Sequence, residues 1–185
     1  MSFCNSLSKT DFITVDTEFL RDKTYWPRLC LIQIGGPDQE AAIDVLAEGL
    51  DLTPVLELMK KPDLLKVFHA ARQDFEIFYR IMGELPFPVI DTQISAMVCG
   101  FGDSVGYETL VSQLIKKKID KSMRFTEWQK RPLSKKQLDY ALADVTHLRI
   151  IYEKLSQMVD NNNRKNWIKE EVNALLDPTL YTFDV

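Results

Sequence analysis

Two carboxylates stand two residues apart in an apolar run, "FITVDTEFL", which spans Phe12 to Leu20. Successive residues of a β-strand face opposite sides of a sheet, so Asp16 and Glu18 are predicted to point the same way and Thr17 the other way. Like charges at this distance raise one another's pKa unless a cation neutralises them. The pair therefore marks either the point where a strand leaves the core or part of a cation site.

Three further side chains could join this pair. Asp74 lies in about the first turn of a predicted helix, "RQDFEIFYRIMG", at the carboxyl end of a buried strand. In "YALAD", Tyr140 and Asp144 are four residues apart and share one helix face. Taken singly, Asp74 is an ordinary acid at a helix N-terminus and the other two are an ordinary interface pair. A strand end, a helix N-terminus and a helix face can nevertheless converge on one point.

Four carboxylates at one point favour a metal site. Ligand sets made only of oxygen select hard cations such as Mg²⁺ or Mn²⁺, and two histidines without paired cysteines disfavour zinc. Two such ions about 4 Å apart can activate a water molecule and stabilise the leaving oxygen of a phosphoryl displacement. Phosphoryl transfer is therefore the chemistry that these residue types suit.

The composition fits one compact domain of 185 residues, 45% apolar and 27% charged. No apolar run is long enough for a bilayer, and an acidic cluster comes too early for a signal peptide, so we expect a cytoplasmic protein without a membrane partner. Cys4, Cys30 and Cys99 are an odd number without CxxC spacing and are expected to be reduced thiols.

Charge is unevenly distributed along the chain. Residues 116–136 contain nine Lys or Arg against two acids, a local charge of +7 within a net charge of −4. Such a run is usually a solvated helix face. Phe125, Trp128 and Pro132 lie among these cations, and basic residues mixed with aromatic ones suit a nucleic-acid backbone and its bases. We therefore predict a basic side that contacts nucleic acid.

The elements that must position these residues alternate between strand and helix. Strands are expected over 12–19, 28–36 and 40–46, and their short connections predict antiparallel pairing. Further strands are expected over 64–70 and 87–92. Helices are expected over 53–61, with Thr53 as its cap, over 72–83, stopped by Gly83, and over 93–100, capped by Asp91 or Thr92.

The last third of the chain is predicted to be helical. Ser134 and Gln137 form a capping box for a long helix whose apolar residues repeat at helical spacing as far as Leu155. A further helix is expected from about Arg164 to Leu176. The whole pattern predicts a mixed sheet with helices packed on it.

"VDTEF", "HAARQDF" and "YALAD", in this order and spacing, match the three exonuclease motifs of the DEDD superfamily, in its tyrosine-containing branch. "DTEFLRDKTYWPRLCLIQIGG" and "TEWQKRPLSKKQLDYALADVTHL" resemble ribonuclease D, and the resemblance extends from about Phe3 to Tyr181. It implies an α/β, ribonuclease H-like fold, in which a mixed five-stranded sheet with one antiparallel strand is flanked by helices. It also implies a single 3′-to-5′ exonuclease domain over residues 1–185.

The implied reaction is hydrolytic release of nucleoside 5′-monophosphates from RNA 3′ ends, such as the trailing ends of tRNA precursors. Carried onto the matching positions, Asp16 would contact two divalent cations, Mg²⁺ or Mn²⁺. Glu18 and Asp144 would complete the first site, and Asp74 would hold the second ion. Tyr140 would orient the attacking water, because an ordinary pKa near 10 makes tyrosine a poor base at neutral pH.

The implied partner is the single-stranded 3′ end of an RNA, or of a DNA. Phe19, Leu20 and Phe75 adjoin the acids and are predicted to stack on the last bases, with core packing as the alternative. Thr17 and His69 belong to the same predicted substrate-binding set. A supporting role is the alternative for Thr17, and a buried, hydrogen-bonded state is the alternative for His69.

Three residues of the basic run complete the predicted substrate-binding set. Trp128, Lys130 and Arg131 are expected to contact phosphates or to order the loop that delivers Tyr140. His147 lies one turn beyond the third motif and is a further candidate to approach the site.

Compared with ribonuclease D, we expect a protein without the helical HRDC-type modules and with a short amino end. Two alternatives stay open: an oligoribonucleotide or DNA-preferring exonuclease with the same site, and a nonenzymatic RNA-binding module. The presence of all four acids and Tyr140 speaks against the second. The oligomeric state stays open.

Overall fold

The five predicted strands form one sheet in a computed structural model that describes residues 2–21, 24–124, 126–162 and 164–182. The strands are β1 (Phe12–Leu20), β2 (Arg28–Gly35), β3 (Glu40–Ile43), β4 (Leu65–Phe68) and β5 (Val89–Asp91), in the spatial order β3-β2-β1-β4-β5. Strand β2 pairs antiparallel with β1 and β3, whereas β1, β4 and β5 pair in parallel. Strand β2 is thus the one strand that runs against the other four, as predicted.

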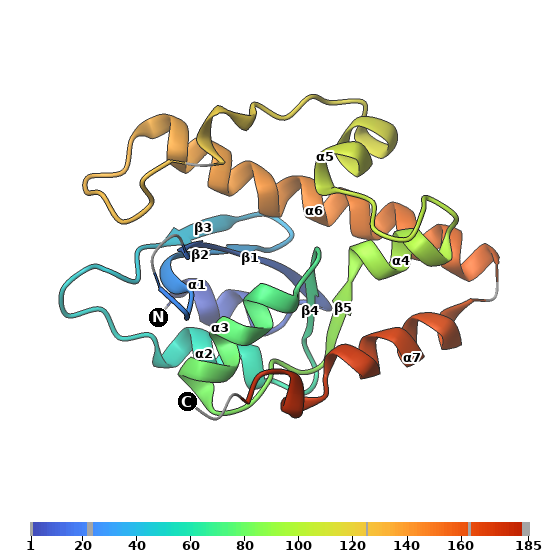
Figure 1. Ribbon diagram of the computed structural model, residues 1–185, viewed down its shortest axis with the longest axis horizontal. Helices are drawn as coiled ribbons and strands as arrows, with labels where there is room; N and C mark the ends of the chain where they lie inside the picture. Colours follow the sequence, from blue (N-terminus) through green and yellow to red (C-terminus); the bar gives the residue numbers. More distant parts are fainter. Residues whose placement is uncertain (1, 22–23, 125, 163, 183–185) are drawn as a thin grey trace.

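Helices cover both faces of this sheet (Figure 1). The α-helices are α1 (Ser2–Leu7), α2 (Thr53–Lys60), α3 (Arg72–Met82), α4 (Thr92–Val98), α5 (Tyr107–Leu110), α6 (Lys135–Asn161) and α7 (Lys165–Leu175). The long helix α6 crosses one face and contacts β1, β2, β3 and β4. Helices α2 and α3 lie on the other face, and α7 packs beside β5 and α4 (Figure 1).

The residues of strand β1 alternate between the two faces of the sheet, so they contact different helices. Ile13 and Val15 belong to the main core, which includes Phe75 and Phe78 of α3. Thr14 faces the other way, toward α6. Continuing the alternation sends Asp16 and Glu18 toward α6 as well, and Thr17 toward α3.

Most predicted boundaries are confirmed. Gly83 ends α3 in the left-handed conformation, with φ of 74°, and the capping box between Ser134 and Gln137 starts α6. Helix α7 covers the range expected for the last helix. Among the described residues, no helix has the length and apolar character that a membrane crossing requires. All three cysteines are free.

Three local predictions need correction. Helix α1 was not expected, because six residues are too few to show helical periodicity, yet its Leu7 is fully buried against Gly36. Strand β3 ends at Ile43, three residues earlier than predicted. Helix α2 is not capped by Thr53: the Asp51 carboxylate instead accepts a hydrogen bond from the Thr53 N–H at 2.9 Å.

Asp91, at the end of β5, holds the start of α3 against the sheet edge. Its carboxylate accepts hydrogen bonds from the N–H groups of Ala70 and Ala71 at 3.0 and 2.9 Å, and from Gln93 at 2.7 Å. The last bond confirms Asp91 as the cap of α4. Ala70 has a φ of 54°, which is unfavourable for a residue with a Cβ, so these bonds maintain a turn that would otherwise relax.

Replacing Asp91 by alanine should therefore lower the free energy of unfolding by about 3 kcal/mol, because a helix cap and two buried N–H groups lose their acceptor. Urea unfolding measures the change. The matched control is Asp177→Ala, which removes an exposed cap from a short 3₁₀ helix and should cost less than about 1 kcal/mol. Equal losses in the two variants would refute the proposed holding role of Asp91.

Candidate active site

Asp16 and Glu18 of β1 meet Asp144 of α6 on one face of the sheet. One carboxylate oxygen from each residue lies within 4.8 Å of the other two. The strand register is irregular between Glu18 and Phe19, as at a β-bulge, a feature that often adjoins active sites. The structure thus brings together three of the four predicted acids from segments more than a hundred residues apart.

Helix α6 is held close to the sheet beside these acids. The Thr14 hydroxyl donates to the carbonyl oxygen of Val145 at 2.8 Å, and the Tyr107 hydroxyl donates to the carbonyl oxygen of Asp144. Gly35 makes the approach possible, because a Cβ at this position would lie 2.5 Å from Thr14 Oγ1 and 3.2 Å from Val145 Cβ. These contacts determine the axial position of α6, and with it the place of the Asp144 carboxylate.

Asp74 approaches the same end of β1 from α3, on the opposite face. Its Oδ1 accepts a hydrogen bond from the Thr17 hydroxyl at 2.5 Å, and both side chains are buried. Thr17 therefore points away from Asp16 and Glu18, as predicted, and orients the fourth acid. Its engaged hydroxyl and 6% exposure favour the supporting role for Thr17 that was the alternative to substrate contact.

Burial dominates the electrostatics of the four acids. It raises the pKa of Asp16 to about 6 and that of Asp144 to about 8. For Glu18, burial and the charges of Asp16, Asp144 and Asp74 raise the pKa to about 10. Burial and the Asp16 charge hold the Asp74 pKa well above its usual range. The raised pKa values favour the protonated forms of these acids unless cations bind, and the all-oxygen donors fit hard divalent cations.

Tyr140 lies on the same α6 face as Asp144. A hydrogen bond from its hydroxyl counteracts part of the rise in the Asp144 pKa. Burial, followed by the charge of Asp144, raises the Tyr140 pKa above its ordinary value, so the hydroxyl keeps its proton. Its ring lies 6.2 Å from that of Trp128 between centroids, at 37°, so Trp128 supports the tyrosine from behind.

For two of the three residues predicted to contact phosphates or to order the loop before Tyr140, the packing favours the ordering role. Trp128 is 2% exposed, within a cluster that includes Cys30, Leu31 and Ala141. Arg131 forms a two-pronged ion pair with Asp44, at 2.5 and 2.6 Å, and also donates to backbone carbonyl oxygens. Both residues order the segment that precedes α6, which was the stated alternative. The sequence did not reveal this because Asp44 lies 87 residues from its partner.

The other residues predicted to contact substrate differ in how deeply they are buried. Phe75 is 1% exposed and packs edge-on against Phe68, which favours the core-packing alternative. Leu20 is half-buried against the Trp128 cluster, whereas Phe19 is half-buried and outside the described core clusters. His69 is half-buried with Nδ1 3.0 Å from Thr92 Oγ1, which favours the hydrogen-bonded alternative.

Lys130 is exposed, and its Nζ lies 3.6 Å from Glu127 Oε2. Its role in phosphate binding stays a prediction. Phe125, which contributed to the prediction of a basic aromatic segment, lies outside the described residues.

Gln33 is a neighbour of the acids that sequence reasoning missed. It lies directly opposite Asp16 in the β1–β2 register and is fully buried. Neither polar atom of its amide has a hydrogen-bond partner among the described residues. The available signal was a single polar residue within the apolar run "LCLIQIG".

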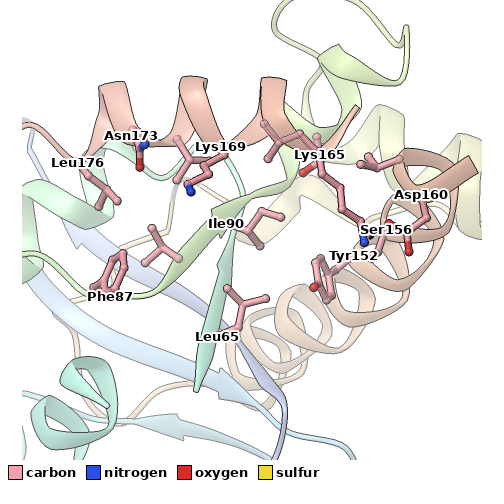
Figure 2. A pocket seen from close by; sticks show the side chains of 15 residues that line it. Leu65, Phe87, Ile90, Tyr152, Ser156, Asp160, Lys165, Lys169, Asn173 and Leu176 are labelled. Atoms are coloured by element: carbon pink, nitrogen blue, oxygen red, sulfur yellow. Dashed lines mark ion pairs between the residues drawn. The ribbon is translucent and has the colours of Figure 1, made fainter. Parts of the chain in front are cut away.

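Two pockets adjoin α6, and only one contains candidate catalytic residues. A pocket of about 300 Å³ is lined by Tyr140 and Asp144. Another, of about 390 Å³, lies between α6, α7 and the sheet edge, where mainly apolar side chains line it (Figure 2). The ion pair between Lys165 and Asp160, at 2.7 Å, lies at its rim.

The chain is similar to a known protein family and to several known proteins. Residues 1–160 match the model of a 3′-5′ exonuclease family. Ribonuclease D from Granulibacter bethesdensis is 52% identical over 183 residues, which are 99% of this chain and 46% of that protein. Ribonuclease D from Acidiphilium cryptum is also 52% identical, over 97% of this chain and 46% of that protein. The chain thus spans about half the length of the curated relatives it matches.

Solved structures share the fold. Escherichia coli RNase D, described as an exoribonuclease involved in structured RNA processing, superposes with a TM-score of 0.92 at 35% identity, covering 99% of this chain and 48% of that chain. Brucella melitensis NrnC with bound Mg²⁺ superposes with a TM-score of 0.81 at 27% identity, covering 94% and 85%. NrnC bound to pGG gives a TM-score of 0.82 at 27% identity, covering 94% and 84%.

The raised pKa values predict how stability depends on pH. A carboxyl group whose pKa is raised on folding destabilises the folded state increasingly as pH rises from its ordinary pKa, near 4, toward the raised value. Without metal, Asp144→Asn should therefore raise the midpoint of thermal unfolding by about 2–4 °C at pH 8.5, and by much less at pH 4.5. Thermal unfolding in EDTA measures both values.

The matched control is Asp139→Asn on the same helix, where an exposed ion pair with Lys135 is lost and no rise is expected. Saturating Mg²⁺ should stabilise the unchanged protein more than Asp144→Asn. A lower unfolding midpoint for Asp144→Asn than for the unchanged protein in EDTA at pH 8.5 would contradict the electrostatic explanation.

Proposed function

The chain belongs to the 3′-5′ exonuclease family, and from this we propose that it is a metal-dependent exoribonuclease that releases nucleoside 5′-monophosphates from RNA 3′ ends. One observation carries the proposal: Asp16, Glu18 and Asp144 place carboxylate oxygens within 4.8 Å of one another, in surroundings that raise their pKa values. Such an arrangement is unfavourable for a purely structural cluster and suitable for binding cations.

In the proposed site, Asp16, Glu18 and Asp144 hold one divalent cation, Mg²⁺ or Mn²⁺, and Asp74 with Asp16 holds a second. Bound there, the cations would supply an ionised water near neutral pH and neutralise charge on the leaving oxygen. Asp74 is oriented for this role by the Thr17 hydroxyl. The Asp91 carboxylate acts on Asp74 indirectly, because it accepts the hydrogen bonds that hold the turn before α3.

Tyr140 keeps its proton in this arrangement, because burial and the Asp144 charge raise its pKa. We therefore assign it to orienting the water through a hydrogen bond rather than to removing a proton. Phe19, half-buried next to Glu18, is the remaining candidate of the first motif to contact the terminal base.

The RNA substrate is supported by the kind of proteins that the chain resembles. Its curated relatives are named ribonuclease D, and the E. coli structure is described as processing structured RNA. We propose a single-stranded 3′ end as the substrate feature, including the trailing ends of tRNA precursors. The second candidate is an enzyme for very short oligoribonucleotides, and the observation that bears on it is the similarity to NrnC, whose structure is bound to pGG.

Incubating 5′-labelled single-stranded RNA with Mg²⁺ should give a ladder that shortens from the 3′ end. Asp16→Asn or Asp144→Asn should reduce the rate by at least about a thousandfold, because each loses a charged ligand. Tyr140→Phe should reduce it by about 10–100-fold. Glu170→Gln, at an exposed position of α7 outside both pockets, should leave it unchanged. The absence of a ladder, or a ladder insensitive to Asp16→Asn, would refute the proposal.

Substrate choice is measured in the same assay. Rates on a dinucleotide, a long single strand, the corresponding DNA strand and a tRNA with an extended 3′ tail separate the candidates. Preference for the dinucleotide would establish the oligoribonucleotide function instead of tail processing.

A further inference from the structure

The structure divides the cations of residues 116–136 according to their partners. Arg131 is paired with Asp44 at 2.5 Å, and Lys135 with Asp139 at 2.8 Å. A different subset lies beside the candidate catalytic residues: Lys118 and Lys136 line the pocket of about 300 Å³ next to α6, and Lys117 Nζ lies 3.4 Å from His147 Nε2.

This pocket lies between residues 118–123 and the face of α6 that carries Tyr140 and Asp144. His147 extends the same helical wall by one further turn. Ile119 and Met123, both half-buried, supply apolar surface on the other wall. Cations at the rim, apolar walls and a size near the lower end of ligand pockets are the properties expected of a nucleotide subsite.

The backbone that carries Lys117 and Lys118 has an unusual shape. Residues Val111–Ile115 form a π-helix, which is rare and often marks functional segments. The next residue, Lys116, has a φ of 61°, in the left-handed region that is unfavourable for side chains with a Cβ. Directly after them, Lys117 lies beside His147 of α6 and Lys118 lines the pocket.

Acidic side chains also line the pocket, but they have partners of their own. Asp139 is paired with Lys135 at 2.8 Å, and Asp120 accepts a hydrogen bond from the Ser122 N–H at 2.9 Å. Lys136 is close enough to contribute to the lowered pKa of Asp120. Lys118 has no ion pair among the part of the chain that the structure describes, and the buried Nδ1 of His147 likewise has no hydrogen-bond partner there.

We propose that this pocket is a subsite for a phosphate-bearing nucleotide next to the catalytic acids, a proposal that rests on the proposed function for the identity of the anion. Lys117, Lys118 and Lys136 contact its phosphate, and Ile119 and Met123 contact its base or ribose. The nucleotide belongs either to the RNA strand or to the released monophosphate. Cations are required here because the acids would otherwise repel a polyanion.

The test compares two double variants with the same change in charge. Lys118→Ala with Lys136→Ala removes two cations that line the pocket, whereas Lys154→Ala with Lys169→Ala removes two exposed cations outside it. If the RNA strand occupies the pocket, the first pair should raise KM for single-stranded RNA by about tenfold relative to the control pair, with kcat unchanged and a smaller salt dependence. If the product occupies it, KM should stay unchanged and the inhibition constant of AMP should rise.

Equal KM values, salt dependence and AMP inhibition in the two pairs would overturn the subsite while leaving the exonuclease assignment intact. Binding of a 5′-labelled oligoribonucleotide and of AMP, followed without cleavage in EDTA, provides a separate readout. It tests the pocket even if no form of the protein cleaves RNA, so the two proposals can fail independently.

A second observation, at Gln33, carries its own inference. Residues directly opposite in an antiparallel pair share a face, so Gln33 lies beside Asp16 on the α6 side of the sheet. A fully buried amide without partners costs free energy, and an apolar side chain would avoid that cost. We infer that Gln33 is a positioning residue whose N–H donates to the Asp16 carboxylate, or to water held there, when the site binds its cation.

Gln33→Leu and Gln33→Met test this inference, because both keep approximate size without the amide. Each should bind Mg²⁺ about tenfold more weakly than the unchanged protein, as titration calorimetry measures, without loss of thermal stability in EDTA. In the cleavage assay, kcat should fall while KM is retained. Unchanged Mg²⁺ affinity in both variants would refute the inference, and a loss of stability alone would indicate a merely structural residue.

Discussion

The close packing of like-charged carboxylates is the constraint on which the rest of this structure depends. Carboxylate oxygens of Asp16, Glu18 and Asp144 lie within 4.8 Å of one another, although burial raises the pKa of all three and neighbouring acids raise those of Glu18 and Asp144 further. Something else must hold the elements together against this cost. The contact between Thr14 and Val145, with Gly35 leaving room for it, does so by fixing α6 on the sheet next to the acids.

The alternation of β1 explains why the four acids arrive from both faces of the sheet. Asp16 and Glu18 face α6, whereas Thr17 faces α3 and there bonds Asp74. The last strand contributes at a distance, because Asp91 holds the turn from which α3 starts. Asp74 and the α6 backbone that carries Asp144 are thus positioned by hydrogen bonds from neighbouring elements, which is how a charged site is kept in one geometry.

The cations of residues 116–136 have different roles in the folded protein. Arg131 and Trp128 serve the packing of the segment before α6, so that Tyr140 lies against a rigid neighbour. Lys118 and Lys136 line the pocket beside the acids instead. A local charge of +7 predicted nucleic-acid contact for the segment as a whole, but the partners of its members depend on residues such as Asp44 far along the chain.

The sequence by itself determined the strands and helices with strong periodicity, the capping box of α6, and the motifs that carry Asp16, Glu18, Asp74, Tyr140 and Asp144, because these signals are local. It did not determine the burial of Phe75, the orienting bond of Thr17 or the position of Gln33 opposite Asp16. Only the tertiary structure decided these, because each depends on which strand or helix lies against the residue. Residue type and spacing determine what a side chain is able to do, whereas packing determines what it meets.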